Sequence, residues 1–98
     1  MPKKSLQTDG NRREDASIMA LNLLAFIATD EDRLNAFCNL TGLGAGELRD
    51  SLGDPGFQAM ALDYALQNED LLIAFADHQG LAPQLVVAAR RHLPGFVE

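Results

Sequence analysis

The chain has 98 residues, a formal net charge of −6 and 47% hydrophobic residues. This length is typical of a single domain and is sufficient for a hydrophobic core that needs no disulfide bonds or metal ions. The hydrophobic fraction excludes a chain that is disordered throughout. Cys38 has no second cysteine to pair with, so an intramolecular disulfide is excluded and a reducing compartment is favoured.

Positive charge is concentrated at the start of the chain. The first thirteen residues carry Lys3, Lys4, Arg12 and Arg13 against Asp9, whereas the rest carries four arginines against thirteen acids. An acidic body disfavours nucleic acid as a partner, because phosphate backbones need clustered cations. Residues 1–12 predict a disordered basic leader. No apolar segment follows the lysines as in a secretory signal, and the longest apolar run, residues 18–28, is too short to span a membrane, so we expect a cytoplasmic protein.

Six helices and no strands are predicted after the leader. The first, residues 13–28, is apolar on nearly all sides, which predicts a buried central helix. In an acidic break at residues 29–32, Thr29 or Asp30 can cap the second helix, residues 31–41. Gly42 ends this helix because glycine adopts the left-handed conformation without strain. A third helix of residues 45–52 ends at Gly53.

The second half of the chain follows the same order. Asp54 and Pro55 mark the start of the fourth helix, because aspartate caps a helix and proline at the first position lacks only an amide that has no helical partner. Asn68 caps the fifth helix and Gly80 ends it. Pro83 opens the sixth helix, and a Pro-Gly pair at residues 94–95 terminates it.

An internal repeat explains this parallel order. Residues 31–43 and 69–81 agree at seven of thirteen positions at an offset of 38, where average composition would give about one match. The matching residues are acids at helix starts, core leucine and phenylalanine, and a terminal Gly-Leu pair. We therefore predict one domain, residues 13–98, with an all-α fold: a compact six-helix bundle of two similar three-helix units, residues 13–53 and 54–96, related by a pseudo-twofold. Phe37 and Phe75 are predicted core residues.

Both Gly-Leu turns also have the spacing of a helix-turn-helix, with a small residue four positions before the glycine and an apolar residue six after it. The two sets are Cys38-Gly42-Leu48 and Ala76-Gly80-Val86. DNA reading requires polar and preferably basic residues at the start of the second helix. Glu47 is acidic there, so the spacing indicates a structural corner, with DNA binding as the alternative.

The remaining chemistry-bearing residues predict no catalytic, metal or cofactor site. Cys38 is predicted to be a small buried residue, and His78 and His92 lack metal-ligand spacing. The acid clusters at helix starts suit the helix dipole. Arg90, Arg91 and His92 form the densest basic patch of the body, and we predict that they bind a partner, together with the basic leader.

The chain resembles a family of short helical alphaproteobacterial proteins, the domain of unknown function 3572, over about residues 17–93. The residues that carry the resemblance are Leu23-Leu24-Ala25-Phe26, the acids at 30–32, Leu34, Phe37, Thr41-Gly42-Leu43, Leu48, Leu72, Phe75, Gly80-Leu81 and Pro83. It implies a bacterial cytoplasmic protein with a compact all-α domain and assigns no catalytic residues.

Together these observations predict a protein–protein interaction or adaptor module that is not an enzyme. It would act through an unknown protein partner or through self-association, without a small-molecule substrate. The alternative is a nucleic-acid-binding regulator that uses the two Gly-Leu turns.

Overall fold

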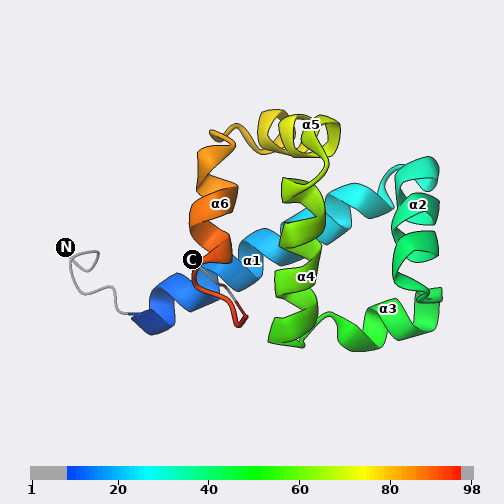
Figure 1. Cartoon of the computed structure of the whole chain (residues 1–98), viewed down its shortest axis with the longest axis horizontal. Coiled ribbons are helices and arrows are strands. Elements are labelled where there is room, and N and C mark those ends of the chain that lie inside the picture. Colours follow the sequence, from blue (N-terminus) through cyan, green and yellow to red (C-terminus); the bar gives the residue numbers. More distant parts are fainter. Residues whose placement is uncertain (1–8, 96–98) are drawn as a thin grey trace.

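The structure is a computed structural model that describes residues 9–95 of the backbone and the side chains from residue 12 onward. These residues form helices and no strand, which confirms the all-α prediction (Figure 1). The elements are α1 (Asp9–Ala28), α2 (Glu31–Thr41), α3 (Ala45–Ser51), α4 (Pro55–Leu66), α5 (Glu69–Gln79) and α6 (Gln84–Arg90).

Helix α1 begins earlier than expected. Its first residue is Asp9, so residues 9–12 are helical and do not belong to a disordered leader. This stretch is polar, and a helix without an apolar stripe leaves no periodic signal in the sequence. The rest of the expected leader, residues 1–8, lies outside the described residues.

The helix ends follow the predicted chemistry. A side-chain oxygen of Asp30 accepts the amides of residues 32 and 33 at 2.9 and 3.2 Å. Asp54 and Asn68 accept the amides of residues 57 and 71 at 3.1 and 3.3 Å. Gly42 and Gly80 close α2 and α5 with φ of 76° and 71°, the left-handed conformation that glycine adopts without strain.

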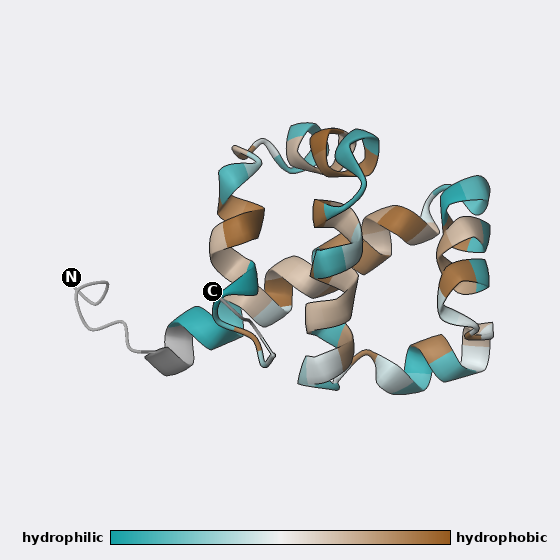
Figure 2. Ribbon diagram, viewed as in Figure 1, coloured by the Kyte–Doolittle hydropathy of each residue, from teal (hydrophilic) through white to brown (hydrophobic). Residues whose placement is uncertain are grey.

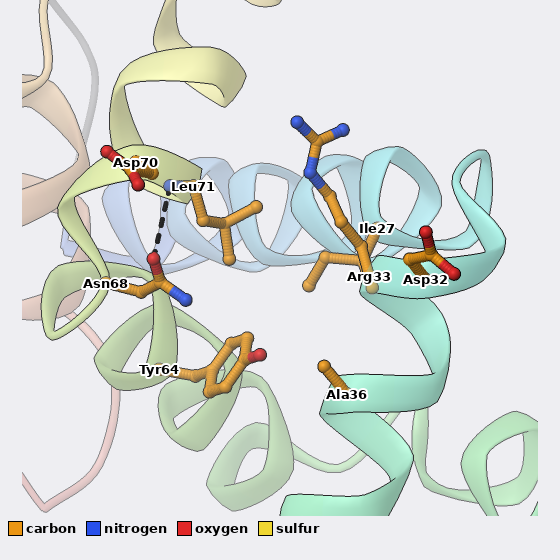
Figure 3. Close-up of a pocket in the computed structure, with 8 residues that line it drawn as sticks. All are labelled: Ile27, Asp32, Arg33, Ala36, Tyr64, Asn68, Asp70 and Leu71. Atoms are coloured by element: carbon orange, nitrogen blue, oxygen red, sulfur yellow. Dashed lines mark hydrogen bonds between the residues drawn. The ribbon is translucent and has the colours of Figure 1, made fainter.

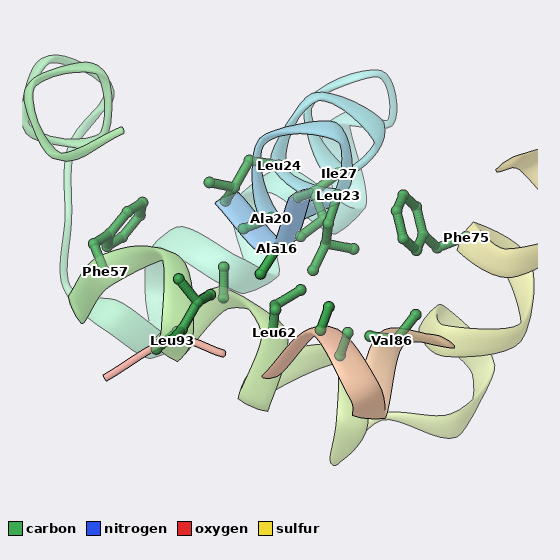
Figure 4. Close-up of a cluster of buried hydrophobic side chains, with 14 of the residues drawn as sticks. Ala16, Ala20, Leu23, Leu24, Ile27, Phe57, Leu62, Phe75, Val86 and Leu93 are labelled. Atoms are coloured by element: carbon green, nitrogen blue, oxygen red, sulfur yellow. The ribbon is translucent and has the colours of Figure 1, made fainter. Parts of the chain in front are cut away.

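The core lies where α1 crosses α4. Helix α1 packs against α2, α4 and α6, and α4 also packs against α5 and α6 (Figure 1). Figure 4 shows side chains of α1 directed toward Leu62 of α4 and Val86 of α6, with Phe75 closing the cluster from α5. Phe37 and Phe75 are fully buried, as predicted. The Phe37 ring meets the rings of Phe57 and Tyr64 edge-on, at centroid distances of 6.2 and 5.1 Å.

Gln58 is a buried polar residue that sequence reasoning did not single out. The residue is 3% exposed. The Ser17 hydroxyl donates to Gln58 Oε1 at 2.8 Å, and Gln58 Nε2 donates to the Leu52 carbonyl at 2.8 Å. One amide therefore ties α1, α4 and the end of α3 together, and both of its polar atoms are satisfied.

The expectation that the first helix is buried on all sides is wrong. Ile18 and Leu21 are 51% and 37% exposed, although Ala16, Ala20 and Leu23 on the same helix are fully buried. The cause is the packing: α4 and α6 cover one side of α1, and no described helix covers the opposite side fully.

The predicted pseudo-twofold is not confirmed. Exchange of the two units would give α3 the environment of α6. Instead, α6 packs against both α1 and α4 and buries Val86, Ala89 and Arg90, whereas α3 has no fully buried residue. Leu48 and Leu52 of α3 are only half-buried against the core. The two units therefore share the caps and glycine turns of α2 and α5, whereas their third helices, although equivalent in sequence, pack differently.

Within residues 9–95, no single helix is both long and apolar enough to cross a membrane. Helices α5 and α6 are long and apolar enough only when they are taken together, and they are bent by 101° relative to each other.

Candidate functional site

The predicted basic patch divides into a buried arginine and an exposed pair. Arg90 is 6% exposed, and its Nε donates to Asp63 Oδ1 of α4 at 2.7 Å. Its Nη1 donates to the carbonyls of Leu93 and Pro94 at 3.1 and 3.0 Å. Arg90 thus holds the chain that follows α6, and its guanidinium is not a surface contact for a partner, in contrast to the expectation.

Arg91 and His92 lie in the chain between Arg90 and the two carbonyls that Arg90 binds. Together with Arg13 of α1 they line an open hollow of about 450 Å³, completed by Leu93 and Pro94. Arg13 and Arg91 are exposed and His92 is half-buried. Figure 1 shows why residues so distant in sequence meet, since the start of α1 and the end of α6 lie at the same end of the molecule.

A smaller groove, which shares His92 with this hollow, lies between α1 and α6. It has a volume of about 260 Å³. Its polar lining is Arg12, His92 and the acidic Asp15, and its apolar lining is Ala16, Met19, Leu85, Ala88 and Ala89. Leu85 is 51% exposed. Figure 2 shows the same contrast on the ribbon, with hydrophilic colour in the first coloured turn of α1 and at the end of α6, and apolar colour on the turns beside them. Cations and apolar side chains therefore share one surface.

We name Arg12, Arg13, Arg91 and His92 the basic end. The exposed acids Glu14 and Asp15 follow directly on α1, so the positive field of the basic end is local. Of the four residues, Arg91 and His92 were predicted as partner-binding. Arg12 and Arg13 were assigned to the leader, and only the structure joins them to the end of α6.

A second hollow lies where α2 and α5 begin, and the repeat supplies both of its acids (Figure 3). Asp32 and Asp70 are equivalent in the two copies, but neither is a cap, since Asp30 and Asn68 perform that role. The hollow has about 230 Å³, below the roughly 300–1,000 Å³ of ligand pockets. Its lining is Ile27, Asp32, Arg33, Ala36, Tyr64, Asn68, Asp70 and Leu71. First-turn acids favour the positive helix ends by themselves, which supports a structural role. Among the described residues, no three His, Cys, Asp or Glu side chains are grouped to hold a metal ion.

The Gly-Leu turns form sharp corners, as the helix-turn-helix alternative requires. The bend of 101° between α5 and α6 falls within the range of about 90–120° typical of that motif. The second helices carry the wrong chemistry at their starts, however. The Glu47 carboxylate accepts the Gly44 amide at 2.9 Å in the first turn of α3, and α6 begins with Gln84, Leu85 and Val86. An acid and apolar side chains there do not favour a phosphate backbone or base edges.

Cys38 and His78 occupy surface positions. Cys38 is half-buried, so the expectation of a buried small residue holds for its repeat equivalent, Ala76, and not for the cysteine. His78 is exposed, and its ring lies 5.0 Å from the ring of Phe26. The Arg33 guanidinium lies 4.9 Å from the same ring, so these contacts cover a half-buried aromatic residue.

Comparisons with known proteins identify one family. Neither a curated protein nor a solved structure shows a significant match to the chain. The family described as Protein of unknown function (DUF3572) matches residues 13–96, a range that covers both copies of the repeat and runs from Arg13 of the basic end to the turn held by Arg90. The chain belongs to this family of proteins of unknown function.

Proposed function

We propose that this domain is a non-catalytic, cytoplasmic protein-interaction module whose basic end binds an acidic segment of a partner protein. The observation that carries the proposal is the hollow shared by Arg13, Arg91 and His92, which brings cations from both ends of the sequence to one surface of a protein with net charge −6. A cationic surface on an acidic protein gives a partner one preferred site and orientation.

Anchoring by Arg90 makes this surface a defined one. Its bonds to Asp63 and to the Leu93 and Pro94 carbonyls fix the turn from which Arg91 and His92 project. An ordered turn loses less conformational entropy on binding than a loose one, so more of the contact energy appears as affinity.

The apolar groove beside the basic end narrows the partner's chemistry. Met19, Leu85 and Ala88 offer contact area that a purely acidic chain would not fill, whereas an acidic amphipathic helix would cover both parts. Duplex DNA uses the cations but leaves this groove unfilled, and Glu47 together with the apolar start of α6 opposes its docking at the glycine turns. A protein partner is therefore favoured over nucleic acid.

Affinity capture from a cell lysate tests the proposal. The immobilised wild type is compared with Arg13→Gln/Arg91→Gln and with the control Asn39→Asp/Gln79→Glu, which makes the net charge equally more negative at exposed sites elsewhere. Captured proteins are quantified by mass spectrometry with and without nuclease treatment.

We expect a defined protein that the wild type and the control retain, that the arginine variant loses, and whose capture weakens as salt is raised. Equal capture by all three proteins would contradict the role of the basic end. Loss of the captured protein after nuclease treatment would instead favour the nucleic-acid alternative.

A further inference from the structure

A second apolar surface lies on the face of α1 that the bundle leaves open. Helices α1 and α3 enclose a groove of about 430 Å³, lined by Leu21, Leu24, Ala25, Ala28, Ala45, Leu48, Arg49 and Leu52. Leu21 is 37% exposed, and Ile18, one turn earlier on the same stripe, is 51% exposed. A groove with one charged residue among eight lining residues resembles half of a helix–helix interface.

The internal repeat shows what such a seam looks like when it is covered. At the offset of 38 residues, Leu21 corresponds to Ala59 and Leu48 to Val86, which are 3% and 0% exposed. The α4–α6 seam that contains Ala59 and Val86 is closed by α1, which packs against both helices. In the first unit no described helix takes that place over α1 and α3. The element that fits the α1–α3 groove is therefore an apolar helix similar to α1.

The pattern of side-chain sizes along the open stripe of α1 is self-complementary. Leu21, Ala25 and Ala28 follow one another at helical spacing, and all three are exposed. If a second α1 packs antiparallel across a twofold axis near Ala25, each Leu21 meets Ala28 of the other copy, twice and by symmetry. Large side chains then face small ones, which permits close packing, and the alanines allow the short interaxial distance of about 8 Å.

Charge also favours a second copy at this groove. The protein is acidic, so most of its surface repels another copy of itself. The groove lining contains no acidic residue, and its one charged residue is Arg49. Repulsion between copies is therefore smaller at this surface than over the acidic parts of the molecule.

We propose that the protein forms a twofold-symmetric homodimer through the α1–α3 groove, with Leu21 of each copy inserted beside Ala28 of the other. This surface is separate from the basic end, so the inference does not rest on the proposed function, and Arg13→Gln/Arg91→Gln is expected to dimerise like the wild type.

Sedimentation equilibrium of the purified full chain tests the dimer. We expect the wild type to have twice the chain mass of 10.6 kDa at about 100 μM, with a Kd of about 1–10 μM. Leu21→Asp is expected to weaken dimerisation at least about a hundredfold, because each interface would then bury two carboxylates without partners. Ile73→Asp is the matched control: Ile73 is 45% exposed on α5, outside the groove, and its substitution leaves dimerisation unchanged.

A cross-linking experiment tests the position of the axis without disturbing the packing. Ala25→Cys in a Cys38→Ser background should form an intermolecular disulfide under mild oxidation, because facing residues at the axis meet the Cα separation of about 5.5–6 Å that a disulfide needs. Ile73→Cys in the same background, exposed on α5 outside the groove, should remain reduced.

Each other outcome overturns the proposal. A monomeric wild type at about 500 μM, or a dimer that Leu21→Asp leaves intact while far-UV circular dichroism shows a folded chain, removes its basis. A trimer or larger species excludes the twofold. A monomer that binds a different protein through Leu21 would assign the groove to a foreign partner.

Discussion

Replacement of Arg90 by alanine tests whether this residue stabilises the fold. The substitution removes the 2.7 Å bond to Asp63 and the two bonds to the Leu93 and Pro94 carbonyls. It also removes a methylene stem that is buried with the residue at 6% exposure.

The expected cost follows from these contacts. Each lost hydrogen bond costs about 1 kcal/mol, and the carboxylate bond is not counted higher because Asp63 is 43% exposed and rehydrates. The lost stem adds about 1 kcal/mol of buried apolar surface. We expect Arg90→Ala to lower the free energy of unfolding by about 2–4 kcal/mol, and Arg90→Lys, which keeps the charge but not the forked geometry, by about half as much.

Urea denaturation followed by circular dichroism measures the effect. The midpoint of Arg90→Ala should fall by about 1–3 M with an unchanged slope. Arg91→Ala, one residue further on and exposed, is the control and should cost less than about 1 kcal/mol, because exposed charge interactions contribute little. If both alanine variants lose equally little, the assignment of Arg90 to the fold is refuted.

Three further predictions concern the core and the turns, each measured in the same denaturation assay. Phe37→Ala should cost about 3–5 kcal/mol because the ring is fully buried, whereas Leu40→Ala, at 70% exposure, should cost less than about 0.5 kcal/mol. Gly80→Ala should cost about 1–2 kcal/mol through its φ of 71° alone, since a Cβ there meets no atom within 4 Å. Gly46→Ala, in an equally open helical position, should instead raise the free energy of unfolding by about 0.5–1 kcal/mol. An equal loss of stability in both variants would show that the positive φ of Gly80 is not the cause. Gln58→Leu should cost about 1–3 kcal/mol, because the hydroxyl of the α1 serine and the carbonyl that ends α3 both lose a buried partner; a neutral result would mean that water replaces the amide.

Local signals in the sequence predicted the six helices and most of their ends, although α6 ends at Arg90, before the Pro-Gly pair that was expected to terminate it. Asn68 was recognised as a cap, Asp30 as one of two candidate caps, and Gly42 and Gly80 as stops. These residues act on backbone groups within four positions of themselves. The start of α1 at Asp9 was missed, since a polar helical turn has no apolar period.

Long-range packing decided the features that the sequence did not reveal. From the sequence, Arg90 was predicted to be part of an exposed basic patch. Its partner Asp63 lies 27 positions earlier, so the sequence around Arg90 does not indicate that the two residues meet. Ile18 and Leu21 read as core residues because hydropathy does not show which side of a helix its neighbours will leave open. For the same reason, only Arg91 and His92 of the basic end were predicted as part of one patch. Arg12 and Arg13 come from the opposite end of the chain and meet them only after α6 folds onto α1.

The unequal use of α3 and α6 has a consequence for the order in which the molecule opens. Backbone amides of α3 are held by a seven-residue helix without a fully buried side chain, so little free energy is lost when that helix unwinds alone. In native-state hydrogen exchange we expect the amides of α3 to exchange through local opening, at rates insensitive to low denaturant. The amides of α1 and α4 at their crossing should exchange only when the whole domain unfolds.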